Sequence, residues 1–133
     1  MAFREKSIVA QMAAILVVYS YYAVRLWGEP LTPVAATAAL IGITILMILI
    51  GIASHIAIAR YSRPEQPDER DLVISRRGSQ NGYGTLAAGV WCVLLLTISH
   101  APYAILFYSI MGAVAVAELV RLGSQLFFYR FMA

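Results

Sequence analysis

Three long stretches of the chain carry no Asp, Glu, Lys or Arg, and they span residues 7–24, 31–59 and 78–117. A helix needs about 20 apolar residues to cross about 30 Å of hydrocarbon, because each residue adds about 1.5 Å. The third stretch is long enough for two such helices, and His100-Ala101-Pro102 forms a break near its middle. Lipid offers the backbone no hydrogen bonds, so each apolar run is expected to be helical. The pattern predicts four transmembrane helices, at about residues 8–27, 33–60, 82–99 and 102–123.

The composition narrows the class of protein further. Of the 133 residues, 61% are hydrophobic and 13% are charged, whereas a typical soluble domain has about 25% charged residues. These figures exclude a disordered chain and argue against a soluble enzyme. Cys92 is the single cysteine, which excludes an internal disulfide and a metal site made of cysteines alone. We therefore expect an all-α integral membrane protein that forms one domain over residues 1–133.

The basic residues predict the orientation of the helices. Apart from Arg25, every Lys and Arg lies near the N-terminus, near the C-terminus or around the polar segment 61–81. These residues are Arg4, Lys6, Arg60, Arg63, Arg70, Arg76, Arg77, Arg121 and Arg130. The positive-inside rule then predicts a four-helix bundle of two in-out-in hairpins, with both termini and a loop over 61–81 in the cytoplasm. For a bacterial chain this is the inner membrane.

Small residues at a spacing of four predict where helices pack closely. Gly78 and Gly82 form one such pair, and Ser109, Ala113 and Ala117 form a longer series in the last helix. Because lipid tails are as apolar as leucine, close backbone contact at small residues is what holds helices together in a bilayer. These faces are expected to pack within the bundle or to form a homodimer interface.

The segment 61–81 is the polar stretch of greatest length. Pro64 and Pro67 end the second helix, and Asp68 is placed to cap a new one, with acidic residues in its first turn. The new segment either lies at the membrane interface or runs through Gly78 and Gly82 into the third helix. Its acids and arginines are expected to tie it to the bundle and to lipid headgroups. A partner-binding surface and a carboxylate metal site are the alternatives, although nearby arginines compete with a metal for the carboxylates.

One part of this segment resembles a known pattern. The residues Asp68-Glu69-Arg70-Asp71, Ile74, Gly78, Gly82 and Tyr83 follow the signature D-E-R-D-x-x-I-x-x-x-G-x-x-x-G-Y. This signature is similar to that of an uncharacterised family of small four-helix bacterial membrane proteins, a domain of unknown function. The opening Phe3-Arg4-Glu5-Lys6-Ser7 is also similar to short bacterial sequences of this kind. The resemblance implies a four-helix fold and a gene neighbourhood that includes helix-turn-helix regulators, and it implies no reaction.

Ionisable residues within the predicted spans are candidates for function, because they are costly in lipid. Glu118 lies three residues before Arg121, and an ion pair between them would satisfy both charges. A coupled proton or cation site at Glu118 is the alternative. His55 is expected to bond a helix carbonyl or an acid of the loop. His55 and His100 lie too far apart in depth to hold one haem, so a haem would need two copies of His55 in a dimer.

The functional prediction follows from what the spans lack. No catalytic triad, zinc-protease motif or phosphate-binding glycine loop is present, so we expect no enzymatic activity and no cofactor. The pI of about 9.2 comes from arginines beside membrane helices and does not indicate nucleic-acid binding. The leading hypothesis is a partner-binding, regulatory or accessory subunit that meets a larger membrane protein, or a second copy, through the loop. An oligomeric transporter or channel for a small solute or ion is the alternative, and a haem-carrying anchor comes after it.

Overall fold

The computed structural model describes residues 3–28, 30–61 and 68–131, and these form four long α-helices with no strand among them. The helices are α1 (Phe3–Leu26), α2 (Pro33–Tyr61), α3 (Glu69–Ile98) and α4 (Tyr103–Phe131). All four are long and apolar enough to cross a membrane. The prediction of an all-helical chain with four such helices is confirmed.

The helix boundaries differ from the predicted ones at the polar ends. The third helix begins at Glu69 and not near residue 82, so the described part of the predicted loop 61–81 is largely helical, while residues 62–67 lie outside the described part. In addition, α1 begins at Phe3 and α4 continues to Phe131. Hydropathy detects only the apolar part of a helix, whereas the polar turns are held by capping and by packing on neighbouring helices. The segment therefore runs on into the third helix, which was one of the two arrangements expected.

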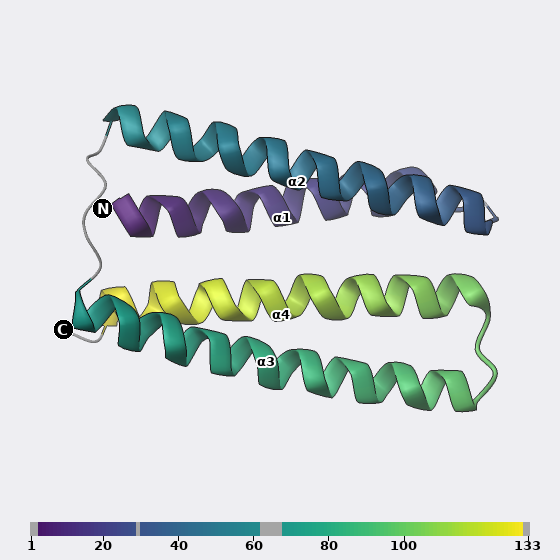
Figure 1. The fold of residues 1–133 in the computed structure, drawn as a ribbon. Helices are drawn as coiled ribbons and strands as arrows, with labels where there is room; N and C mark the ends of the chain where they lie inside the picture. Colours follow the sequence, from purple (N-terminus) through teal and green to yellow (C-terminus); the bar gives the residue numbers. More distant parts are fainter. Residues whose placement is uncertain (1–2, 29, 62–67, 132–133) are drawn as a thin grey trace.

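The four helices lie side by side in the order α2, α1, α4, α3 (Figure 1). Within the described chain, α2 packs extensively only on α1, and α3 packs extensively only on α4. The two pairs meet where α1 contacts α4, around the buried side chains of Ile8, Ile15 and Leu122. A closed four-helix bundle would also pack its first and last neighbours together. Here α2 and α3 stay apart, so the arrangement is open along one side.

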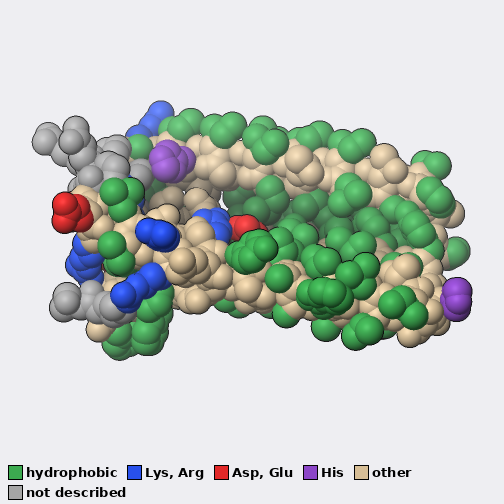
Figure 2. All heavy atoms as spheres, turned by 60° about the horizontal axis from the view of Figure 1, so that its bottom comes forward, with side chains coloured by type: hydrophobic (Ala, Val, Ile, Leu, Met, Phe, Trp, Pro, Cys, Tyr) green, Lys and Arg blue, Asp and Glu red, His purple; other side chains and the backbone are tan. Residues whose placement is uncertain are grey.

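The charged residues gather at one end of the molecule (Figure 2). At this end α1 and α3 begin, α2 and α4 finish, and both described termini lie (Figure 1). We call it the charged end. The opposite end holds the two short connections, where Gly28 has a φ of 81° and His100 a φ of 56°. Between the ends the helix surfaces are mostly apolar and exposed, as expected for side chains that face lipid.

Candidate functional site

The start of α3 is fixed by two aspartates of the signature. The backbone N–H of Asp71 donates to Asp68 Oδ1 at 2.8 Å, and the backbone N–H of Asp68 donates to Asp71 Oδ2 at 3.1 Å. This reciprocal capping box satisfies backbone donors that the first turn of a helix leaves without partners. The expected cap at Asp68 is confirmed, and the same bonds explain why a polar segment starts a helix here.

Asp71 also joins three helices at the charged end. Its Oδ1 accepts a hydrogen bond of 2.6 Å from the hydroxyl of Tyr129 on α4, and its Oδ2 lies 3.4 Å from Nε of Arg4 on α1. The Asp71 side chain is 12% exposed and the Arg4 side chain 31% exposed, so each charge offsets the other where water has limited access. Asp71 is therefore a structural junction between α1, α3 and α4.

Arg70 is tied to the same end of α4. Its Nη2 donates to the backbone carbonyl of Tyr129 at 3.0 Å, and its guanidinium stands 5.9 Å from the centre of the Tyr129 ring. A cation near a helix C-terminus satisfies carbonyls that have no partner within the helix. Glu69, the remaining acid of the signature, is exposed. Three of the four D-E-R-D residues thus contribute to folding of the charged end.

The signature glycines bring α3 into close contact with α4. A Cβ added at Gly78 would lie 2.5 Å from Gln125 Cγ and 2.9 Å from the carbonyl oxygen of Arg121. One added at Gly82 would lie 2.8 Å from Arg121 Cβ. Ile74, one turn before Gly78, is buried in the same interface. The spacing of four that the signature shows is therefore the packing face of α3 on α4, which is the first of the two arrangements expected for it.

Tyr83 does not share this face. Its side chain is 75% exposed, and it lies with Glu69, Leu72, Val73, Arg76 and Gln80 on the opposite side of the helix. We call these six exposed residues the outer face of α3. Leu72 and Val73 are large apolar side chains exposed at the charged end. The signature region thus has a packed side and an uncovered side.

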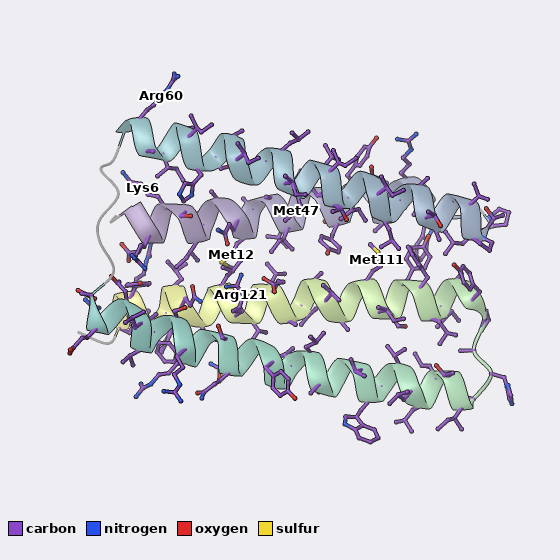
Figure 3. All side chains as sticks on the ribbon, viewed as in Figure 1. Lys6, Met12, Met47, Arg60, Met111 and Arg121 are labelled. Atoms are coloured by element: carbon purple, nitrogen blue, oxygen red, sulfur yellow. The ribbon has the colours of Figure 1, made fainter. Side chains whose placement is uncertain are left out.

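Glu118 and Arg121 form the expected ion pair on α4. Both Nε and Nη2 of Arg121 donate to Glu118 Oε2, at 3.1 Å and 2.8 Å. Both side chains are only partly buried, so the pair contributes little stability by itself. Figure 3 shows Arg121 on the side of α4 that faces α1, near Met12. The pair lies beside a hollow that the sequence did not indicate.

This hollow is a groove of about 480 Å³ between α1, α2 and α4. Ile15, Ile43 and Met47 give it apolar walls, and Glu118 and Thr44 are among its polar lining residues. We call this cavity the groove. The groove exists because α2 packs extensively only on α1, which leaves the space between α2 and α4 unfilled. Figure 2 shows the molecule hollowed there. A bundle closed on all sides would have no such space.

A second cavity of about 400 Å³ continues the groove toward the charged end. We call it the mouth. It takes side chains from all four helices, including Arg4, His55, Ser75 and Gln125. Four residues line both cavities, which makes them continuous: Ser7, Gln11, His55 and Leu122. His55, proposed from the sequence as an intramembrane polar residue, is thus an exposed residue at the junction of the mouth and the groove.

The two histidines lie at opposite ends of the molecule (Figure 2). His55 is near the end of α2, and His100 is in the turn that follows α3. In the described ranges no three His, Cys, Asp or Glu side chains come together as a metal site would require. A single chain therefore offers no paired histidines for one haem.

The sequence did not identify three residues that belong to this site. Arg4 counted only as a basic residue of the opening segment, Tyr129 only as an aromatic residue near the interface, and Gln125 had no assigned role. Their partners lie on other helices, so no local pattern links Tyr129 to Asp71. The one local signal was the spacing of Arg121 and Gln125, which continues the small-residue series of α4 by steps of four from Ala117. No protein-family model, curated protein or solved structure matches the chain.

Proposed function

We propose that the chain is a non-enzymatic subunit of the bacterial inner membrane that binds a larger membrane protein at its cytoplasmic side. In this proposal the charged end faces the cytoplasm, and both termini lie there, as the positive-inside rule requires. The resemblance of the Asp68-to-Tyr83 signature to a family of small four-helix bacterial membrane proteins supports the bacterial assignment. In this role the chain assists or regulates an activity that the larger partner carries out.

The outer face of α3 carries this proposal. The opposite side of the helix is bound to α4 through Asp71, Gly78 and Gly82, so the outer face is held in a fixed position. Leu72 is 64% exposed there, beside the exposed Arg76. Apolar side chains next to an exposed arginine suit a partner with a complementary apolar and acidic surface, since mixed charge and apolar contact gives specificity. A lipid headgroup layer would use the arginine but would gain little from a defined apolar pattern.

Purification from the native host in mild detergent, followed by mass spectrometry, tests the proposal. A double variant, Leu72→Asp with Arg76→Glu, should lose the proteins that co-purify with the natural chain. Its thermal unfolding should change little, because both side chains are exposed and Arg76 has no polar partner in the described chain. Arg130→Glu, an exposed charge reversal at the same end, is the control and should keep the partner. An identical set of co-purifying proteins for the double variant, or a set containing only further copies of this chain, would contradict the proposal.

A further inference from the structure

The mouth is lined by basic and neutral donors and by no carboxylate of the described chain. Its two charged lining residues are Arg4 and Arg121. Nε of Arg4 is buried beside Asp71, 3.4 Å away, so only the Nη1 and Nη2 groups of this guanidinium can reach a molecule in the cavity. Arg121 uses Nε and Nη2 on Glu118, which leaves its Nη1 amino group for another acceptor. Asp71 and Glu118 each face one of these arginines, and the guanidinium donors that they leave unused can hold a group with several oxygen acceptors, such as a phosphate.

Gln125 gives an independent indication of a ligand. Its side chain lines the mouth, and the residue is only 8% exposed. Among the described residues its amide has no hydrogen-bond partner. The amide atoms are not among the wholly buried side-chain atoms of the described chain, so they open onto the mouth, where an unpaired amide needs water or a ligand as a partner. An acceptor bound in the mouth would supply the missing partner.

The groove behind the mouth suits a hydrocarbon chain. It extends along α1 from Ser7 to Tyr19, which is about 18 Å at about 1.5 Å per residue. Its apolar walls include Ile43, Met47 and Ile48. Ser7 lies about 29 Å along α1 from Leu26, close to the thickness of about 30 Å of the hydrocarbon layer. The mouth is therefore at the level where lipid phosphates lie, and the groove is at the level of their chains.

We propose that the mouth and the groove together bind one anionic phospholipid. Its phosphate accepts hydrogen bonds from Arg4, Arg121 and Gln125, and one acyl chain lies in the groove between α2 and α4. The open side of the helix arrangement lets the lipid enter from the bilayer without crossing the protein. The bound chain also supplies packing that α2 lacks, because α2 has no extensive contact with α4.

Native mass spectrometry of the full-length chain in neutral detergent tests the proposal. Phosphatidylglycerol should bind at one molecule per chain and at least about tenfold more tightly than phosphatidylcholine, a difference of about 1.4 kcal/mol. Gln125→Leu and Arg4→Gln should each weaken phosphatidylglycerol binding about tenfold. Arg130→Gln, which removes an exposed charge of the same end outside the mouth, should leave it unchanged.

A substitution at a glycine that lines the groove tests separately whether the groove binds an acyl chain. Gly51 lines the groove, and no atom lies within 4 Å of a Cβ added there, so Gly51→Leu should fill the groove without a clash. This variant should fold normally and lose phosphatidylglycerol. Gly84→Leu is its control, because Gly84 has equally open space and lies outside the groove.

Equal affinity for phosphatidylcholine and phosphatidylglycerol would overturn the proposal. So would a folded Gly51→Leu or Gln125→Leu variant that binds phosphatidylglycerol as tightly as the unaltered chain. Inorganic phosphate should not displace phosphatidylglycerol at equal concentration, since it lacks the chain. Full displacement by phosphate would show a site for free anions and would also overturn the assignment to a lipid.

Discussion

At the scale of single residues, Asp71 explains most about the charged end. Its two carboxylate oxygens accept hydrogen bonds from the Tyr129 hydroxyl and from its own helix cap, and Arg4 stands beside them. One side chain therefore starts α3 and also joins it to α4 and α1. The sequence predicted that the acids of this segment, Asp71 among them, tie it to the bundle, with a partner-binding surface as the alternative. Asp71 does make such internal contacts, and its partners Tyr129 and Arg4 lie on other helices that no local pattern could reveal.

The hydroxyl of Tyr129 provides a direct test of this junction. Tyr129→Phe removes one donor to a half-buried carboxylate and keeps the ring, so it should lower the free energy of unfolding by about 1.5–3 kcal/mol, the range for hydrogen bonds to charged groups. Unfolding in mixed detergent micelles, followed by circular dichroism, measures this loss. Tyr83→Phe is the control, because Tyr83 is exposed and its hydroxyl has no partner in the described chain. Equal stability of both variants would contradict a structural role for the Asp71 junction.

At the scale of helices, the apolar cores were predictable and the polar ends were not. The charge-free stretches locate all four helices, because only an apolar helix of about 20 residues suits a bilayer. The first turns of α3 are polar, and hydropathy gave no reason to join them to the apolar part. Their helical state depends on the cap at Asp68 and on the fit of Gly78 and Gly82 against α4. The spacing of the glycines was visible in the sequence, whereas the helix that they contact was not.

The contact of α3 with α4 predicts opposite outcomes for two glycines of one helix. Gly78→Ala should lower the free energy of unfolding by about 1–3 kcal/mol, because the new methyl group would overlap Gln125 and the Arg121 carbonyl. Gly84→Ala should cause no loss, because its Cβ would meet no atom within 4 Å and alanine favours the helix. The same micelle unfolding measurement compares them. A Gly84→Ala variant as unstable as Gly78→Ala would show that the close contact at Gly78 is not the cause.

At the scale of the whole molecule, the open arrangement of the helices has the largest consequence. The sequence predicted a four-helix bundle without specifying which helices pack on one another, and four antiparallel helices with short turns often surround one core. Instead the two helix pairs meet mainly where α1 contacts α4, with the Arg4–Asp71 ion pair joining α1 to α3 at the charged end, and the groove remains between α2 and α4. Whether four transmembrane helices pack into a closed bundle or an open arrangement depends on how well the side chains fit at each helix–helix interface. Composition and periodicity do not encode that fit, which is why the groove and the mouth could not be predicted from the sequence.

The orientation that the charge asymmetry predicts can be measured with single cysteines. In a chain with Cys92→Ser, Ser99→Cys places a thiol at the end with the short turns, and Glu69→Cys places one at the charged end. Both positions are exposed. Because basic residues stay in the cytoplasm, a membrane-impermeant maleimide added to cells with an opened outer membrane should label Ser99→Cys at once. It should label Glu69→Cys only after the inner membrane is disrupted, and the reverse pattern would place both termini outside and remove the cytoplasmic position that the partner proposal requires.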